Sequence, residues 1–556
     1  MKLYCTIVFL SLLYLYGNAQ TVEYLNANNI EIGIGVGGVL FTEVDPNVSG
    51  GANYQMCKVP KGSNTVANFA ATLWLAGYDT MPGASVCATE TYGTSDTTFF
   101  DGPVIPLGAP HRYDATYDAY YKRVFKVTRS QLVAHQALPF PVQEAQVSTQ
   151  MLQWPGKGNP YVMSTYGINI SSPLAHFIDV DHDGIYDATK GDYPEFCGEQ
   201  AIFFCFNTDR RPNNTSLNAE MTMEIRGLAE VFVDAAAPNY EKGAINNTLL
   251  VSYEIQNKVL LGGGGFSDFY VALWQDPDLG CFNNDRVGSD ASRNMMFAYN
   301  NGVDPNCNGV TGYGNRKIAI GTKLLNRPVS TIGYFTNVGG PDMHDPTTCD
   351  EAGNYMRGYW LDNTHFTAGG NGHNTGTPTN FMFFSDPNDA GGWSDYTSGQ
   401  QAGDRRMYAS SGPMTFTGNE TKRFQYAFIA SYDSTATHLT IVDTLKRDAD
   451  LFQQFYDQEI TACRSQFVNG VESLQGPLQV SVCPNPALDL LNIQAEAPIQ
   501  QIELLDVLGR TVFTKTNCGE KTAITVSAFS PGVYLVKVSS AGKEAVKKIV
   551  LNTGGF

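Results

Sequence analysis

The sequence has little positive charge, and no long apolar segment follows its N-terminus. Lys and Arg number 36 against 54 Asp and Glu, which gives a formal net charge of −18. An acidic surface repels phosphate backbones, so we expect no nucleic-acid partner. After the first 20 residues, no stretch is long and apolar enough to cross a bilayer, so we expect no membrane span.

Familiar catalytic motifs are also missing. The chain contains no HExxH, no GxSxG, no GxxxxGK[ST] and no CxxC. The glycine-rich run Gly33–Gly38 leads into an apolar strand, whereas a dinucleotide site needs a helix there. We therefore predict no catalytic residue and no organic cofactor, and the balance favours a non-catalytic protein.

The N-terminus has the pattern of a secretory signal peptide, residues 1–19. Lys2 provides the positive charge, Leu3–Tyr16 is a short apolar run, and Gly17-Asn18-Ala19 resembles a cleavage site. Of the eleven cysteines, Cys5 would leave with this peptide, and the remaining ten permit disulfides in an exported chain. Proximity in sequence suggests the pairs Cys57–Cys87, Cys197–Cys205, Cys281–Cys307 and Cys483–Cys518, although sequence alone cannot fix the connectivity.

What is abundant points to β structure. Aromatic residues make up 12% of the chain, and frequent Gly and Pro punctuate short apolar runs such as Leu249–Ile255 and Phe266–Trp274. One helix is predicted near residues 440–460, where Ile441, Leu445 and Phe452 recur at helical spacing. The fold class is therefore mostly β, with a multi-domain β-sandwich body and one helix on its C-terminal side.

We divide the body into two β-rich regions, residues 20–195 and 196–470. A linker is predicted near residues 470–477, and a separate C-terminal domain spans residues 477–552.

An Asp-rich loop at residues 179–192 is the strongest chemical signal in the body. Acidic residues alternate, Gly184 permits a sharp turn, and such a set of hard oxygen ligands suits a structural Ca²⁺ ion. The predicted ligands are Asp179, Asp181, Asp183, the Ile185 carbonyl, Asp187 and Asp192. Lys190 stands where an EF-hand has its bidentate Glu, so the motif is more similar to a thrombospondin type 3 loop. The alternative is a solvated acidic turn without an ion.

Weaker signals lie in other loops. Asp276, Asp278, Asp285 and Asp290 could bind a second calcium ion or form a polar loop. Arg405-Arg406 is the densest basic cluster of the body, and it could form a structural ion pair or bind an anionic ligand. Three histidines in loops, His344, His365 and His373, could bind a transition metal or be solvated. Trp393 is the tryptophan most suited to exposure.

The last ~75 residues contain short strands and turns that predict a small Ig-like β-sandwich. The strings PNPALDLLNI, IELLDVLGRTV, FSPGVYLVKV and KKIVL, in this order, resemble the type A C-terminal sorting domain of type IX secretion cargo. Cys483 departs from that pattern. The resemblance implies export across both membranes of a member of the Bacteroidota, followed by surface anchoring or release. An ordinary terminal β-sandwich is the alternative.

The body also resembles secreted Bacteroidota proteins that carry the same tail and a DxDxDGxxD loop. The matching segments are VPKGSNTVANFAATLWLAGYD, LAHFIDVDHDGIYDATKGDYP, YVALWQDPDLG, YMRGYW and GDRRMYASSGPM. This resemblance implies an architecture and no mechanism.

Together these patterns predict a secreted, calcium-binding β-rich protein on the outer cell surface or in the medium. We expect it to be non-catalytic and to act in adhesion or in glycan or matrix binding. Its partners would be the type IX secretion machinery, through the tail, and an extracellular glycan or protein ligand. The alternative is a secreted hydrolase of polysaccharide or peptide, because paired carboxylates on a β-sandwich leave no sequence motif.

Overall fold

The computed structural model describes most of the chain in two compact units, Met1–Ser465 and Gln466–Phe556. The described residues are 21–44, 53–80, 83–92, 98–106, 108–209, 221–239, 243–258, 265–336, 342–464, 480–506, 511–540 and 543–552. The predicted signal peptide and the predicted linker at 470–477 lie outside them. Strands hold 40% of the residues and helices 17%, which confirms the mostly β fold class.

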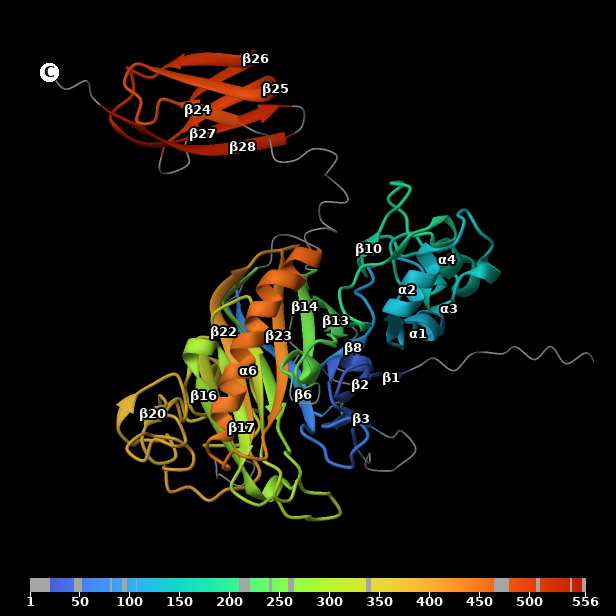
Figure 1. Ribbon diagram of the computed structural model, residues 1–556, viewed down its shortest axis with the longest axis vertical. Coiled ribbons are helices and arrows are strands. Elements are labelled where there is room, and N and C mark those ends of the chain that lie inside the picture. Colours follow the sequence, from blue (N-terminus) through green and yellow to red (C-terminus); the bar gives the residue numbers. More distant parts are fainter. Residues whose placement is uncertain are drawn as a thin grey trace, which may run out of the picture. The chain divides into compact units, whose positions relative to one another are not determined.

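Two large antiparallel sheets form the body (Figure 1). The larger one follows the order β16 (Asp285–Asp290), β17 (Met295–Asn300), β18 (Ile318–Leu324), β23 (Thr421–Tyr432), β14 (Thr248–Asn257), β13 (Met223–Val231), β12 (Gln200–Asn207), β8 (Phe100–Asp101), with β9 (Phe125–Thr128) beside β12. The second follows the order β19 (Thr331–Phe335), β22 (Arg406–Phe416), β15 (Phe266–Asp276), β6 (Ala70–Asp79), β7 (Ser85–Thr89). Strand β6 from the first predicted region pairs with β15 from the second, so residue 195 does not separate two sheets.

Small sheets of two or three strands make up the rest of the β structure among the described residues of the body. They are β1 (Val22–Leu25), β2 (Glu31–Gly35) and β5 (Cys57–Lys58); β3 (Thr42–Val44) and β4 (Asn53–Gln55); β10 (Phe177–Ile178) and β11 (Tyr193–Pro194); β20 (Thr367–Ala368) and β21 (Thr377–Pro378). The α-helices of this unit are α1 (Ala115–Tyr121), α2 (Arg129–Gln136), α3 (Thr149–Leu152), α4 (Pro160–Tyr166), α5 (Cys349–Arg357) and α6 (Ile441–Phe455).

Successive side chains of a strand point to opposite faces of its sheet, so one strand can contribute to two cores. The main core of the body lies between the two large sheets. On β12, Ile202, Phe204 and Phe206 enter the main core with Trp74 and Trp274 of the second sheet. The alternate residues of β12 face a separate core that α1 to α4 build around Trp154. The sheet is therefore covered on both faces, which explains why its strands are apolar almost throughout.

Helix α6 covers another part of the larger sheet (Figure 1). Its predicted stripe of Ile441, Leu445 and Phe452 is fully buried against β17, β18 and β23. The helical segment continues as a π-helical turn, Tyr456–Ile460. The predicted helix at 440–460 is thus confirmed.

Three disulfides tie the body together, and one of the four predicted pairs is correct. Cys281–Cys307 forms as predicted, whereas Cys87 pairs with Cys349 and Cys197 with Cys463. The predicted Cys197–Cys205 bond is wrong because β12 runs extended from Gln200 to Cys205, over roughly 16 Å, beyond the ~7 Å reach of a disulfide. The predicted Cys57–Cys87 bond is wrong too: Cys57 is a buried free thiol on β5, and Cys87 on β7 faces α5.

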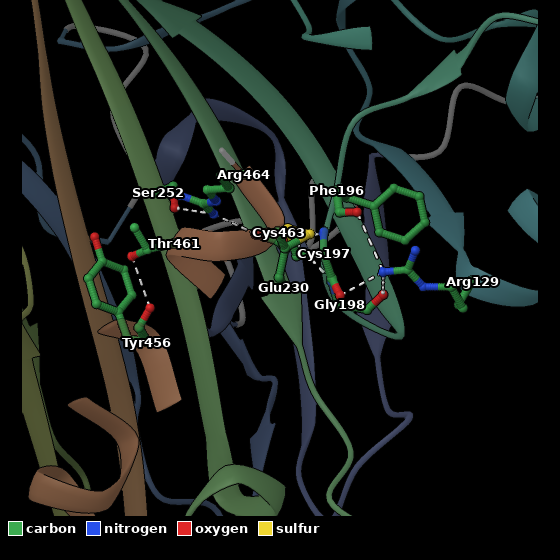
Figure 2. Close-up of a disulfide and its surroundings, with 10 residues drawn as sticks. All are labelled: Arg129, Phe196, Cys197, Gly198, Glu230, Ser252, Tyr456, Thr461, Cys463 and Arg464. Atoms are coloured by element: carbon green, nitrogen blue, oxygen red, sulfur yellow. Dashed lines mark hydrogen bonds and ion pairs between the residues drawn. A yellow bond between two sulfur atoms is a disulfide. The ribbon is translucent and has the colours of Figure 1, made fainter. Parts of the chain in front are cut away.

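The bond between Cys197 and Cys463 fastens the end of the helical segment to the chain entering β12 (Figure 2). On one side, Arg129 Nη2 donates hydrogen bonds to the Phe196, Cys197 and Gly198 carbonyls. On the other, Arg464 Nη2 lies 2.7 Å from a carboxylate oxygen of the fully buried Glu230.

The C-terminal unit is a barrel-like β domain. Its strands are β24 (Val480–Cys483), β25 (Leu490–Leu505), β26 (Thr511–Thr525), β27 (Gly532–Ser540) and β28 (Lys543–Leu551). Strand β25 is long, and its register with β26 shifts between Gln494 and Gln501. The first part of β25 pairs with β24 and the second with β27, and side chains of all three strands share one apolar core.

The predicted Cys483–Cys518 bond in this unit is wrong, since both thiols are free. Cys483 lies opposite Asn492 of β25, whereas Gly519, the neighbour of Cys518, lies opposite Ile499. The two positions therefore lie seven residues apart along β25, at Asn492 and at Ile499.

Candidate functional site

The Asp-rich loop connects β10 and β11, which pair antiparallel with Ile178 opposite Tyr193. Asp179 follows β10 directly and Asp192 precedes β11 directly, so the strand pairing brings the two ends of the loop together. Gly184 has φ +77°, a left-handed conformation that the turn of the loop requires and that glycine adopts without strain.

Three of the predicted ligands converge in this loop. Asp179, Asp181 and Asp192 each offer a carboxylate oxygen, all within 4.8 Å of one another. Asp192 is fully buried and accepts hydrogen bonds from the Val180 and Asp187 amides, while its burial raises its pKa to about 6. The buried Oδ1 of Asp179 accepts no hydrogen bond from the residues that the structure describes.

The other three predicted ligands have different environments. Asp183 lies 2.6 Å from Lys190 Nζ, and this hydrogen bond is the main cause that lowers the Asp183 pKa. Asp187 accepts hydrogen bonds from the Thr189 amide and hydroxyl. The Ile185 side chain is exposed. Lys190 also lies 3.2 Å from Asp181, so an ammonium group stands beside the cluster.

The second acidic stretch leads to a different site, at the end of β15 and the start of β22. Gln275 pairs with Met407 in the strand register, so Asp276 and Arg406 meet at the sheet edge. Arg406 Nη2 lies 3.3 Å from Asp276 Oδ2, and Arg406 also forms an ion pair with Asp404. The predicted ion pairing of Arg406 is thus correct.

A cavity of about 300 Å³ opens at this edge. Its lining combines carboxylates, a guanidinium, a phenol and two phenyl rings: Asp276, Asp278, Asp404, Arg406, Tyr92, Phe69 and Phe282. We refer to these seven residues as the edge pocket. Asp276, Asp278 and Asp404 each offer a carboxylate oxygen, all within 4.8 Å of one another, so part of the predicted acidic group converges here. Asp285 and Asp290 do not line the cavity: Asp285 accepts a hydrogen bond from the Leu279 amide, and Asp290 pairs with Arg293.

Hydrogen bonds connect three side chains that line the edge pocket. The Tyr92 hydroxyl donates to Asp276 Oδ2 at 2.9 Å and accepts from Arg406 Nε and Nη2 at 3.1 and 2.9 Å. Burial, reinforced by the charge of Asp278, raises the Asp276 pKa well above its usual range. Burial and then the charge of Asp404 raise the Asp278 pKa to about 7. The pocket thus offers hydrogen-bond donors and acceptors side by side.

Sequence reasoning missed Tyr92, Phe69 and Phe282. Tyr92 is 314 residues from Arg406, and nothing near it in sequence resembles a ligand motif. It reaches the pocket because it follows β7, two strands away from β15 across β6. A long-range contact of this kind has no local pattern in the chain.

Among the described residues, the three predicted histidines do not come together, although His373 converges with Asp342 and Asp362 to within 4.8 Å. His373 Nε2 lies 2.9 Å from Asp362, whereas His344 and His365 each bond a nearby backbone carbonyl. Among the tryptophans, Trp393 is partly buried, with its Nε1 donating to the Gly370 carbonyl. The other four are fully buried, so they offer no stacking surface.

Comparison with known families identifies the C-terminal unit. Residues 481–552 match the secretion system C-terminal sorting domain. The predicted sorting tail is confirmed. A chain with this sorting domain is a secreted protein, surface-attached or released, and the tail implies the secretion machinery as a partner. No helix among the described residues is long and apolar enough to cross a membrane.

A solved structure similar to part of this chain is that of a polysaccharide lyase. It aligns with 9% identity and a TM-score of 0.16, over 62% of this chain and 37% of the lyase. The chain thus spans little more than a third of that enzyme's length. None of the curated proteins compared with the sequence matches it.

Proposed function

We propose that the protein is a calcium-binding extracellular protein that binds a glycan or matrix ligand without catalysis and is exported by type IX secretion. One observation supports the calcium proposal: Asp179, Asp181 and Asp192 converge in the loop that connects β10 and β11. All three groups are hard oxygen donors, the kind that Ca²⁺ prefers. The buried, unpartnered Asp179 Oδ1 supplies a further reason, because a buried carboxylate oxygen without a partner is costly.

Calcium would neutralise the carboxylates and connect the two ends of the loop. Asp179, Asp181 and Asp192 would hold the ion. Lys190, whose side chain is 43% exposed, would leave Asp181 as the ion binds, because cation and ammonium compete for the same oxygen. Asp183, the Ile185 carbonyl and Asp187, also predicted as ligands, would need to turn toward the ion.

Thermal unfolding of the full chain tests the calcium proposal. We expect the transition temperature to rise with Ca²⁺ and fall in EDTA, since a ligand at 100 times its Kd stabilises the native state by about 2.7 kcal/mol. Asp181→Asn should abolish the shift, whereas Glu144→Gln, at an exposed position outside the loop, should retain it. An identical transition with Ca²⁺ and EDTA in the unmodified protein would refute the proposal.

A glycan array and a broad hydrolase screen on the same protein test the binding proposal. Retention on the array without bond cleavage is the expected result. The second candidate function, a secreted hydrolase, is favoured by one observation: the edge pocket holds carboxylates whose pKa values are raised, as general acids require. Turnover of any polysaccharide or peptide would establish that alternative.

A further inference from the structure

We propose that the edge pocket binds a single ring of a neutral, polyhydroxylated saccharide. This inference rests on the proposed binding function and names the ligand class and its site. The pocket stands apart in sequence from the Asp179–Asp192 loop, with its lining drawn from residues 69 to 92, 276 to 282 and 404 to 406.

The charges of the pocket disfavour ionic ligands of either sign. The Asp404 carboxylate would repel a sulfate, phosphate or uronate group, because like charges repel each other strongly in a partly dry cavity. Burial raises the pKa values of Asp276 and Asp278, so these two groups add less negative charge than free carboxylates would. Arg406, whose side chain is only 8% exposed, places a positive charge against the same cavity and opposes an ammonium group. A neutral ligand meets neither penalty.

The hydrogen-bonding groups match hydroxyls, which both donate and accept. The carboxyl groups of Asp276, Asp278 and Asp404 line the cavity, so they offer oxygen acceptors to the hydroxyls of a ligand. Arg406 and the Tyr92 hydroxyl provide donors beside the carboxylates.

The apolar part of the lining suits the C–H face of a sugar ring. Phe69 and Tyr92 pack edge to face with ring centroids 5.5 Å apart, which fixes their orientation. Phe282 is a further aromatic residue of the lining. Such rings offer rigid apolar area at little cost in conformational entropy.

The size of the pocket limits the ligand to one ring. Small-molecule sites enclose about 300–1,000 Å³, and the edge pocket, at about 300 Å³, lies at the lower end. A bare divalent cation would leave most of this space and the aromatic rings unused. We therefore assign the pocket to a terminal or side-chain sugar and not to a metal ion.

Titration of the full-length protein with methyl glycosides tests the assignment. The probes are the methyl glycosides of glucose, galactose, mannose and xylose, with glucuronic acid and glucosamine as charged analogues of the glucose ring. Isothermal titration and saturation-transfer NMR should detect binding of at least one methyl glycoside and weaker binding of both charged sugars.

Variants locate the binding. Asp278→Asn and Phe282→Leu should each weaken it about tenfold, the effect of losing roughly 1.4 kcal/mol. Glu144→Gln, at an exposed position outside the pocket and the acidic loop, should leave it unchanged. Unfolding transitions confirm that each variant is folded, and the two pocket variants change different chemistry, so a folding defect in one leaves the other informative.

Three results would overturn the assignment: no binding of any methyl glycoside, preference for a charged sugar, or saturable Ca²⁺ uptake that Asp278→Asn removes. Each leaves the calcium test at the acidic loop and the array result intact, so failure here is distinct from failure of the proposed function. Cleavage of a bound methyl glycoside would support the pocket and refute the non-catalytic role.

Discussion

At the scale of single residues, burial decides what the acidic side chains of the body do. Asp192 and Asp276 are both buried, but their partners differ. Asp192 accepts hydrogen bonds from two backbone amides, whereas Asp276 accepts a hydrogen bond from Tyr92 and pairs with Arg406. Asp183, by contrast, is exposed and pairs with Lys190. Three aspartates thus have different roles: Asp192 stabilises the loop, Asp276 lines the pocket and Asp183 lies on the surface. The roles differ because the side chains differ in solvent exposure and in their partners.

Asp278 gives a prediction about pH. Its pKa rises from 3.8 to about 7 in the folded protein, so between these values the native state binds more protons than the unfolded state. The stability it contributes is therefore complete below its usual pKa and is lost as pH rises through about 7. Asp276, Asp404 and Arg406 face the same carboxyl group.

We expect Asp278→Asn to remove this pH dependence. Urea unfolding of both proteins across about pH 4–8 should show the free-energy difference shifting in favour of Asn as pH increases. Glu144→Gln, on the exposed surface, serves as the control and should run parallel to the unmodified protein. A constant difference between Asp278→Asn and the unmodified protein across this range would contradict the prediction.

Glu230 gives a second prediction at this scale. Its buried carboxylate accepts hydrogen bonds from the Cys197 and Gly198 amides and from Arg464 (Figure 2). Replacement by Gln removes the charge and one acceptor, so a buried donor loses its partner. We expect Glu230→Gln to lower the free energy of unfolding by about 1–3 kcal/mol in urea titrations. A change below about 0.5 kcal/mol would place it with ordinary surface substitutions.

At the scale of elements, the larger sheet is buried on both faces. The alternating side chains of β12 and the apolar stripe of α6 each contribute to this burial. The strand sends Ile202 and Phe204 into the sandwich core and Phe203 into the helical core. Helix α6 buries the same sheet elsewhere, with Leu445 close to Gly321 of β18. Gly321 leaves room for that leucine, since an added Cβ would lie 3.2 Å from its methyl carbons.

Leu445→Ala should destabilise the body by about 2–5 kcal/mol, because it removes buried methyl groups and leaves a cavity under α6. Leu451 lies on the same helix but is 47% exposed, so Leu451→Ala provides a matched control. We expect the control to change stability by less than about 0.5 kcal/mol. Chemical denaturation of the two variants measures both values, and equal effects would mean that α6 does not pack through this face.

At the scale of the whole molecule, the body and the sorting domain are separate compact units, each with its own core. The body has its disulfides and both large sheets within Met1–Ser465. Folding of the body should therefore not depend on the tail, whereas delivery to the cell surface should.

Deletion of residues 477–556 should leave a folded body in the periplasm. Cell fractionation and surface proteolysis locate the protein, and an unchanged main unfolding transition shows that the body is intact. The full-length chain carrying Leu451→Ala is a suitable control, since its sorting domain is complete. Normal surface delivery of the truncated protein would contradict the sorting role of the tail.

Local patterns were sufficient for much of the fold. The 3.6-residue stripe of Ile441, Leu445 and Phe452 predicted α6, and the apolar runs predicted strands such as β14 and β15. The sorting tail was recognisable because its signal lies in one continuous segment, residues 481–552. Periodicity works in these cases because helix and strand geometry repeat over a few residues.

Long-range pairing was beyond such patterns. Two of the three disulfides join cysteines 262 and 266 residues apart, and only Cys281–Cys307, 26 residues apart, was predicted from proximity. The edge pocket combines Tyr92, Asp276 and Arg406 because three strands of one sheet end together. The acidic loop, predicted with six ligands, brings three together, since the β10–β11 pairing fixes its ends and Lys190 engages Asp183.

The sequence by itself determined the secretion address, the predominance of strands, the helix at its C-terminal side and the place of an acidic loop, because each depends on residues close along the chain. The tertiary structure decided the cysteine partners, the sharing of sheets across residue 195 and the assembly of the edge pocket. These depend on which strands pair, and strand pairing is set by the burial of apolar faces over the whole body.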